Sequence, residues 1–397
     1  MKEICCKNEC TGCTACVSVC STNAIYMKTD DNGFLYPVID ESKCIDCKLC
    51  QKTCPMINCE ILKSKFYKSQ KAYLGKNQES IRIKSSSGGM FHAFASNILQ
   101  HNGVVYGAGF KNDLSIVHKR VDKLDALDDL MASKYAQSTM NNTYQKVYQD
   151  LISGKQVYFS GCPCQVSGLI MFLDKKNCQM TNLITQDFVC HGVGSPKFLK
   201  DYLNEYEKKY KSKAVHVNFR GKPKPGKLQN MIIDFDNGKK FVAFSTNEDF
   251  YYYHFLNNLI LRPSCFECKY SKIEHQSDIT LGDCFLIKEN DVIDDEKGMS
   301  YIQVNSDKGI ELLEKLDSSI WVKEVDITKY VQPNMKKPTP KPSMYDLFWN
   351  TYITKGYYAA TKEYGNRNFK HMIKRIIIRI VNDLGIVRII KKIIRKK

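Results

Sequence analysis

Short apolar runs separated by turn residues predict a small hairpin followed by a larger body of alternating strands and helices. Residues 24–27 and 34–39 flank the turn Asp30-Asp31-Asn32-Gly33, a pattern typical of a hairpin. From residue 81 onward, strands are expected at 104–110, 157–160, 183–189, 214–220 and 278–282, and a further pair within 229–244 is joined across Asn237-Gly238. Helices are expected at 90–99, after the turn at 161–164, and at 196–210, and a further helix is expected to end at 256–261. Such alternation indicates an α/β body.

Eight of the 18 cysteines form two copies of one spacing near the N-terminus. The copies are Cys10-x2-Cys13-x2-Cys16-x3-Cys20 and Cys44-x2-Cys47-x2-Cys50-x3-Cys54-Pro55. Three thiolates two residues apart can hold one [4Fe-4S] cluster, while the fourth cysteine reaches the neighbouring cluster. The predicted ligand sets are therefore Cys10, Cys13 and Cys16 with Cys54, and Cys44, Cys47 and Cys50 with Cys20.

Zinc or a disulfide framework are the alternatives for these cysteines, but the duplicated spacing favours two iron–sulfur clusters. Ser21 stands where Pro55 stands in the second copy, which predicts a slightly looser turn after Cys20 without the loss of a ligand.

Four later cysteines form a candidate third site. Cys265-x2-Cys268 is half of a metal site, and Cys164 and Cys190 each follow a predicted strand. Together they could hold one more cubane or a zinc ion. The alternative is that Cys164 and Cys190 are buried, unreactive thiols.

The stretch Ser85-Ser86-Ser87-Gly88-Gly89 precedes a predicted helix and offers hydroxyls and amides to a phosphate. An ordinary N-cap is the alternative. His191 could donate a proton or simply pack in its loop, and Lys134 and Tyr135 could contact an anionic cofactor or lie in a solvated loop.

Charge is concentrated at the C-terminus. The chain of 397 residues has a net charge of +17, and residues 367–397, with eleven Lys or Arg and one acid, carry +10 of it. Apolar residues recur there at helical spacing: Ile373, Ile376, Ile377, Ile380, Leu384 and Val387. This predicts a basic amphipathic helix on an anionic membrane surface, with packing on its own domain or a partner as the alternative. Nucleic acid is not expected, because the tail has no interleaved aromatic residue beyond Phe369.

The mean hydropathy is −0.37, and no window of about 18 apolar residues exists. The first residues contain no apolar leader. We therefore expect a cytoplasmic protein, attached peripherally to the inner face of the membrane if the tail binds there. In that reducing compartment many thiols favour metal.

Six short motifs follow one another along the chain and resemble one family. They are Ser86-Ser87-Gly88-Gly89-Met90-Phe91, Lys134-Tyr135-Ala136-Gln137-Ser138, Pro163-Cys164-Gln165-Val166, Cys190-His191-Gly192, Arg262-Pro263-Ser264-Cys265-x2-Cys268-Lys269-Tyr270 and Asp278-Ile279-Thr280-Leu281-Gly282-Asp283. Together with the cysteine runs they resemble the coenzyme F420 hydrogenase/dehydrogenase beta-subunit proteins that carry an N-terminal double-cluster ferredoxin.

The resemblance implies FAD in the α/β body, with Ser87, Gly88, Gly89, Lys134 and Gln137 as cofactor-binding residues. It also implies a third [4Fe-4S] cluster on Cys164, Cys190, Cys265 and Cys268. The chain departs from the family pattern at Cys162, where Thr is frequent, and at Cys284-Phe285, where an aromatic pair is usual. Either Cys162 or Cys284 could replace one of the four ligands.

The implied function is that of an iron–sulfur flavoprotein oxidoreductase. Electrons would pass between a soluble donor or acceptor protein, the cluster pair and a flavin that reduces or oxidises a deazaflavin or another organic substrate. The C-terminal extension resembles relatives linked to surface polysaccharide biosynthesis. The alternative is a non-enzymatic electron-transfer subunit that docks a partner oxidoreductase at the membrane surface. The sequence identifies no catalytic acid–base pair, and this does not decide between the two functions, because flavin hydride transfer often needs none.

The expected fold is an α+β ferredoxin-like two-cluster module, followed by an α/β flavin-binding body and a C-terminal basic amphipathic helix. The corresponding segments are the two-cluster domain at 1–60, a linker at 61–80, the beta-subunit N-terminal region at 81–155, its C-terminal region at 156–330, and the extension at 331–397.

Overall fold

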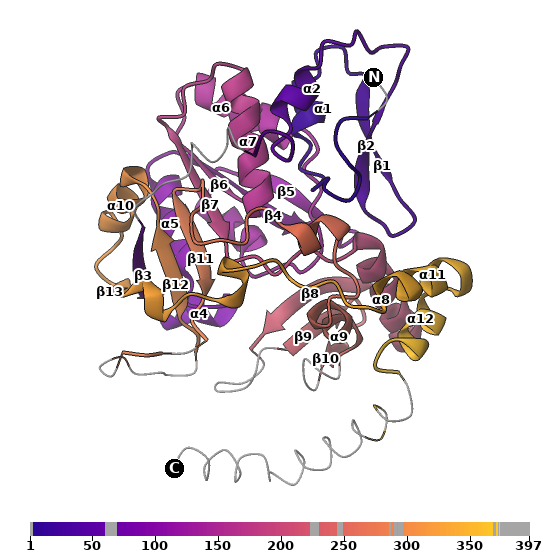
Figure 1. The fold of residues 1–397 in the computed structure, drawn as a ribbon. Helices are drawn as coiled ribbons and strands as arrows, with labels where there is room; N and C mark the ends of the chain where they lie inside the picture. The colour runs from indigo at the N-terminus through magenta and orange to yellow at the C-terminus, as the bar shows by residue number, and fades with distance from the viewer. Residues whose placement is uncertain are drawn as a thin grey trace.

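A mixed β-sheet organises the body of the protein (Figure 1). The computed structural model describes residues 3–59, 70–222, 230–243, 249–285, 287–289, 292, 297–367, 371 and 373. In this part of the chain the largest sheet has eight strands in the order β13-β3-β12-β11-β7-β6-β4-β5. The strands are β3 (Lys71–Lys76), β4 (Val104–Phe110), β5 (Ile116–Val121), β6 (Val157–Ser160), β7 (Leu183–Phe188), β11 (Ile279–Asp283), β12 (Ser300–Val304) and β13 (Trp321–Val325).

The middle of this sheet is parallel. Strands β4, β6, β7 and β11 pair in parallel, and antiparallel pairs flank them on both sides. Val157, Tyr158 and Phe159 of β6 are all fully buried, as expected for a parallel strand covered on both faces.

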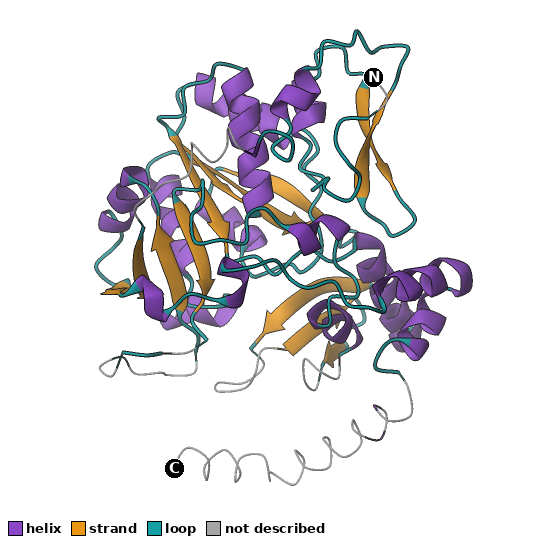
Figure 2. Cartoon of the chain, viewed as in Figure 1, coloured by secondary structure: helices purple, strands orange, loops and turns teal. Residues whose placement is uncertain are grey.

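Helices cover both faces of the large sheet (Figure 2). Val105 and Tyr158 pack with α5 (Met90–Gln100) and α10 (Asp307–Glu314), whereas Tyr106 and Phe159 pack with α6 (Thr143–Ile152) and α7 (Pro163–Lys175). This division follows from the alternation of side chains along each strand. The short helix α4 (Glu79–Lys84) precedes the Ser-Gly stretch and α5.

A second sheet joins an aromatic-rich helical layer. Strands β8 (Ala214–Gly221), β9 (Asn230–Phe235) and β10 (Lys240–Val242) form it in the order β10-β9-β8. Its core is shared with α8 (Pro196–Tyr210), α9 (Phe250–Leu256), α11 (Tyr345–Lys355) and α12 (Tyr357–Glu363). Short 3₁₀ helices connect other elements: η1 (Leu124–Leu130), η2 (Pro263–Glu267), η3 (Ile327–Lys329) and η4 (Pro333–Met335).

The N-terminal module repeats one local geometry. Helix α1 (Ala15–Val19) contains Cys16 and is capped by Cys20, and α2 (Leu49–Thr53) contains Cys50 and is capped by Cys54. The two caps have nearly the same backbone, with φ and ψ of −71° and 109° at Cys20 and −70° and 117° at Cys54. The predicted loosening of the first turn by Ser21 is therefore not seen at its cap.

The predicted hairpin is confirmed as β1 (Ile25–Thr29) paired antiparallel with β2 (Leu35–Ile39). Its turn rests on the body, because Ser195 Oγ donates to the carbonyl of Asn32 at 2.5 Å and Lys197 Nζ donates to that of Asp31 at 2.9 Å. The module is thus held against the N-terminus of α8.

Three sequence expectations need correction. The linker predicted at 61–80 contains β3, which pairs with both β12 and β13 inside the large sheet. The helix expected to end within 256–261 ends at Leu256. The extension predicted from residue 331 begins inside the body, because Tyr345, Phe348 and Trp349 belong to its aromatic core.

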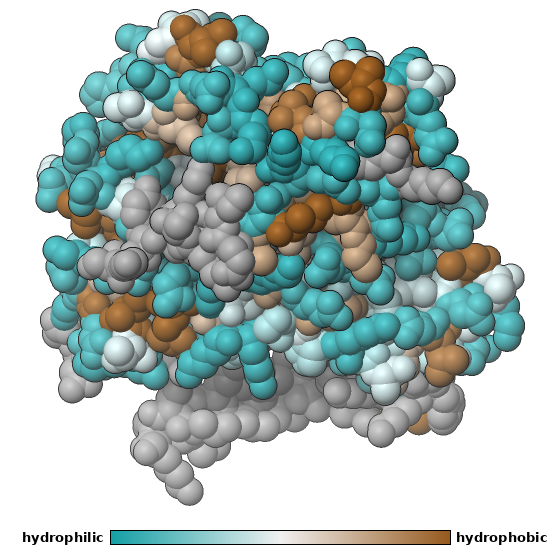
Figure 3. Space-filling view, turned by 45° about the horizontal axis from the view of Figure 1, so that its top comes forward, coloured by the Kyte–Doolittle hydropathy of each residue, from teal (hydrophilic) through white to brown (hydrophobic). Residues whose placement is uncertain are grey.

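The basic tail beyond residue 373 lies outside the described residues, so its predicted amphipathic helix stays a prediction. Among the described helices, none is long and apolar enough to cross a bilayer. The face drawn in Figure 3 is mainly hydrophilic, with small separate hydrophobic groups.

Candidate functional site

A cavity of about 610 Å³ opens at the carboxyl ends of the parallel strands. Its wall includes Ala108 near the end of β4, Ser160 at the end of β6, Phe188 at the end of β7 and Asp283 at the end of β11. Ligands of α/β proteins bind at this edge of the sheet. The volume lies within the range typical of cofactor and small-molecule sites.

The Ser-Gly stretch forms one wall of this cavity. Ser86 Oγ accepts a hydrogen bond from the amide of Ser133 at 2.7 Å, and Ser87 Oγ donates to the carbonyl of Met299 at 2.7 Å. Gly89, with φ of 82°, is the N-cap of α5. These contacts fix the conformation of the loop. The N-terminus of α5, whose first amides have no partner within the helix, lies at the cavity.

Gly88 supports this loop rather than lining the cavity. Its amide donates to Ser300 Oγ at 3.0 Å, and a Cβ at this position would lie 2.3 Å from the carbonyl oxygen of Gly75. Only glycine fits there without a shift of β3.

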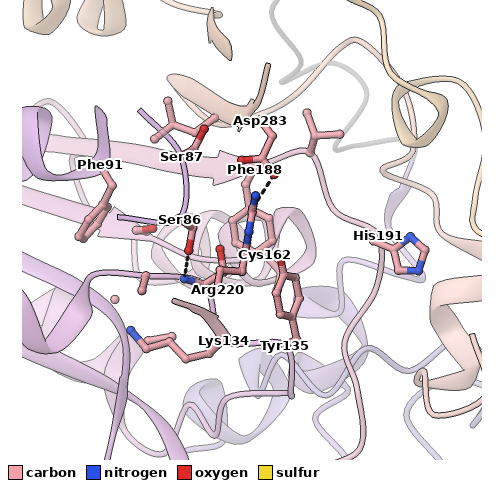
Figure 4. Close-up of a pocket in the computed structure, with 18 of the residues that line it drawn as sticks. Ser86, Ser87, Phe91, Lys134, Tyr135, Cys162, Phe188, His191, Arg220 and Asp283 are labelled. Atoms are coloured by element: carbon pink, nitrogen blue, oxygen red, sulfur yellow. Dashed lines mark hydrogen bonds and ion pairs between the residues drawn. The ribbon is translucent and has the colours of Figure 1, made fainter. Parts of the chain in front are cut away.

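Charged groups also line the cavity (Figure 4). Arg220 Nη1 pairs with Asp283 Oδ2 at 2.5 Å. Lys134 Nζ donates to the carbonyl of Met131 at 2.7 Å, and burial lowers the pKa of Lys134 to about 7. Burial also lowers the pKa of His118 to about 4, so this histidine is neutral near pH 7.

One buried acceptor of the cavity wall is unused. Gln186 Oε1 has no hydrogen-bond partner in the described part of the chain, although Gln186 is 2% exposed. A buried polar atom without a partner is costly, and a bound ligand with a donor group would satisfy it. A ligand that donates a hydrogen bond to Gln186 Oε1 would therefore fit this cavity.

Gln137 does not take the predicted position. It is absent from the cavity wall, its Nε2 donates to the carbonyl of Thr11 at 2.9 Å, and its Oε1 accepts from Arg262 Nη1 at 2.8 Å. Its side chain connects the body to the N-terminal module, so a direct contact with a cofactor in the cavity is not supported.

The four later cysteines come together around a second, smaller cavity. Cys164 lies in the first turn of α7, Cys190 follows β7, Cys265 lies in η2 and Cys268 caps η2. Burial raises the pKa of Cys265, and the charges of the other three cysteines of the group raise it further. Burial also raises the pKa of Cys268, to about 12 in the absence of metal.

Cys162 is a fifth thiol of this group. It lines both cavities, and its hydrogen bonds with Cys164 and Cys190 raise its own pKa and lower that of Cys164. Cys284 lies elsewhere, in the packing around Tyr330 and away from the second cavity. Of the two residues that could replace a ligand, only Cys162 is in place to do so.

The first N-terminal ligand set is also brought together. Cys10, Cys13, Cys16 and Cys54 line one small cavity. Cys5, which the spacing argument missed, lies among them, and its hydrogen bonds lower the pKa of Cys10 to about 6 and that of Cys54 to about 7. A cysteine outside the repeated spacing carries no sequence signal for this position.

The second N-terminal set lies nearer the surface. Cys50 is close enough to Cys47 and Cys20 for their charges to raise its pKa, after the larger effect of burial. Cys47 is exposed and Cys44 is half-buried in the loop before α2. In the described part of the chain, no three His, Cys, Asp or Glu side chains surround a single-ion site. A cubane needs a wider arrangement, because each thiolate binds a different iron.

The three groups of thiols and the large cavity are neighbours. Thr11 and Met56 of the N-terminal module line the cavity of the later cysteines. Burial raises the pKa of Cys13, and the charge of Cys164 adds a smaller contribution in the same direction. Cys162 and His191 line both that cavity and the large one. The thiols thus lead from the module to the carboxyl edge of the sheet.

Comparison with known proteins agrees with this arrangement. Residues 154–329 match the family model that describes the C terminus of the coenzyme F420 hydrogenase/dehydrogenase beta subunit, and residues 9–57 match a 4Fe-4S dicluster domain. Over residues 154–329 the chain is therefore similar to this subunit. The resemblance predicted from the motifs is confirmed, and the chain is an iron–sulfur electron-transfer protein of the oxidoreductase type.

The family match contains all four later cysteines but begins after the Ser-Gly stretch and Lys134. No curated protein matches the chain significantly. A chain in the structure titled "Xenon derivatization of the F420-reducing [NiFe] hydrogenase complex from Methanosarcina barkeri" is 14% identical, covering 75% of this chain and 90% of that chain with a TM-score of 0.43.

Proposed function

We propose that the protein is an iron–sulfur flavoprotein that passes electrons between its N-terminal cluster pair and FAD in the large cavity, through a third [4Fe-4S] cluster. The proposed third-cluster ligands are Cys164, Cys190, Cys265 and Cys268. The organic substrate would be a deazaflavin or a compound of similar redox chemistry. The single observation that carries the proposal is the continuity of thiols from Cys13 through Cys164 and Cys162 to the large cavity.

The cavity wall supports FAD as its occupant. The hydroxyl of Ser86 and the N-terminus of α5 suit a pyrophosphate, and Lys134 adds a positive charge when protonated. Ser87 Oγ, which donates to the carbonyl of Met299, shapes the loop beside them. Phe91 and Phe188 line the same cavity and offer apolar contact to a ring system. A bound flavin would accept electrons one at a time and pass them on as a pair, while the protein positions it and excludes water.

The donor set supports iron at the third site. Four thiols from three separate segments of the chain surround one cavity, which matches the Cys₄ ligation of cubanes. Cys162 would then be a thiol next to the cluster that faces the flavin cavity. Should Cys162 ligate instead of Cys164, Cys164 would be the free thiol beside the cluster.

The surface position of Cys44 and Cys47 supports exchange of electrons there with a soluble partner protein. We also propose that the protein takes part in surface polysaccharide synthesis and that residues 374–397 attach it to an anionic membrane. Residues 374–397 lie outside the described part of the chain. Deleting 374–397 tests the second part, because it leaves Arg367 in its ion pair with Glu205. Unchanged binding to phosphatidylserine vesicles would show that the tail is no anchor.

Cofactor content tests the proposed function. Purified without oxygen, the full chain should contain one FAD and about twelve irons, three cubanes of four. The double variant Cys265→Ser, Cys268→Ser should retain about eight irons, the content of the N-terminal pair. Cys178→Ser, on a thiol outside all three groups, is the matched control and should resemble the wild type. About eight irons and no flavin in the wild type would instead favour a non-enzymatic electron-transfer subunit.

A further inference from the structure

Arg262 is among the largest fully buried side chains of the protein, with 1% of its surface exposed. Its backbone joins two loops of the later cysteine group. The amide of Arg262 donates to the carbonyl of Val193 at 2.9 Å, three residues after Cys190, and its carbonyl accepts from the amide of Cys265 at 2.9 Å. It therefore helps to fix the spacing between two of the proposed third-cluster ligands.

The side chain of Arg262 crosses into the N-terminal module. Nε donates to the carbonyl of Cys10 at 2.7 Å, and Nη2 donates to the carbonyl of Leu35 at 3.0 Å and approaches Cys10 Sγ at 3.8 Å. The guanidinium lies 4.2 Å from the centre of the Tyr36 ring. One residue thus contacts a predicted ligand of the first cluster and the loops of the third.

The charge of Arg262 has no carboxylate partner among these contacts. Its oxygen acceptors are the two backbone carbonyls and Gln137 Oε1, all of them neutral. A guanidinium stays protonated even when buried, and an unpaired buried charge costs several kcal/mol. The negative groups beside it are the thiolates: Cys10 Sγ lies 3.8 Å from Nη2, and Arg262 lines the same cavity as the four later cysteines.

We propose that Arg262 is the buried counter-cation shared by the cluster on Cys10 and the third cluster, and that it makes both easier to reduce. Reduction adds a negative charge to a cluster. A fixed positive charge a few ångströms away, buried from solvent, stabilises the reduced form more than the oxidised form. The hydrogen bond to Cys10 Sγ acts in the same direction. Arg262 is a positioning residue that also sets potentials.

The part of this inference that concerns Cys10 depends on the dicluster module alone. The part that concerns the third cluster rests on the proposed function. The two are separated by the iron content of the wild type, which tests the proposed function without reference to Arg262.

The test is a redox titration of the full chain, monitored by electron paramagnetic resonance. In Arg262→Met, the ratio of reduced to oxidised cluster at the wild-type midpoint should fall at least about tenfold, equivalent to a shift of about 59 mV toward negative potential. Arg262→Lys keeps the charge and should lie closer to the wild type. Gln137→Glu leaves Arg262 in place but pairs it with a carboxylate, and should shift the midpoint in the same direction as Arg262→Met.

Lys7→Met is the matched control, because Lys7 belongs to the same module but its side chain is 63% exposed. Solvent screens such a charge, so the midpoint should barely move. Unchanged midpoints in Arg262→Met and Gln137→Glu, with iron content intact, would overturn the inference. If Arg262→Met fails to assemble its clusters, Gln137→Glu decides: an unshifted midpoint in that variant reduces Arg262 to a structural role.

Discussion

At the scale of single residues, the N-terminal module and the body pack so closely around residue 12 that only a glycine fits there without a clash. Gly12, between Cys10 and Cys13, has φ of 68°, and a Cβ there would lie 2.9 Å from both Arg262 Nη1 and Gln137 Nε2. A glycine at this position lets two buried polar side chains lie flat against the loop that holds the first cluster. The contact between the two parts of the chain depends on the absence of one methyl group.

Gly12→Ala should lower the free energy of unfolding by about 1–3 kcal/mol, because it adds a clash to an unfavourable left-handed backbone. Gly154→Ala is the matched control, since Gly154 has φ of 81° but nothing within 4 Å of its Cβ position. Thermal unfolding without oxygen measures both. Equal losses in the two variants would mean that the contact with Arg262 and Gln137 imposes no constraint.

Lys134 gives the proposed flavin site a pH dependence. Burial lowers its pKa to about 7, so the lysine of the flavin-free protein is protonated below this pH and neutral above it. A pyrophosphate favours the protonated form, so affinity for FAD should fall as the pH rises above about 7, by up to about tenfold per pH unit. Titration of flavin-free protein with FAD measures this, with Lys134→Gln expected to give a flat profile. The same slope in both proteins would exclude Lys134 from the binding site.

At the scale of elements, the body extends further along the chain than its motifs do. Helix α11 carries Phe348 with none of its surface exposed and Trp349 with 3% exposed, both in the core that also holds α8 and α9. The C-terminal helices therefore complete the body, and the extension proper begins after them.

Phe348→Ala should lower the free energy of unfolding by about 3–5 kcal/mol, because it opens a cavity in this aromatic core. Leu347→Ala, on the same helix but 57% exposed, should change it by less than about 0.5 kcal/mol. Chemical denaturation without oxygen compares the two. A small effect of Phe348→Ala would indicate that α11 is dispensable for the body.

The elements predicted correctly are those whose sequences carry a clear local pattern. The hairpin has a polar turn between apolar runs, α5 and α8 have helical periodicity, and β6 is a fully buried run. Strand β3 was missed because Lys71 and Lys76 bound it and its partners, β12 and β13, lie more than 220 residues further along the chain. Nothing local marks such a pairing.

At the scale of the whole molecule, the sequence predicted which cysteines act together better than it predicted what surrounds them. Regular spacing and strand ends pointed to the thiols of the first and third groups, which the structure brings together. Cys5, Gln137 and the reach of Arg262 depend on how the module docks onto the body, and no pattern along the chain encodes that contact. The contacts that connect the thiol groups therefore depend on how the N-terminal module packs on the body.

Stopped-flow reduction tests the central claim most directly. FAD-loaded protein is mixed without oxygen with a reduced soluble ferredoxin, and cluster and flavin absorbance are followed together. The wild type and Cys178→Ser should show bleaching of the clusters followed by bleaching of the flavin. In Cys265→Ser, Cys268→Ser the N-terminal clusters should bleach while the flavin stays oxidised. Flavin bleaching at the wild-type rate in that double variant would contradict a path through the third cluster.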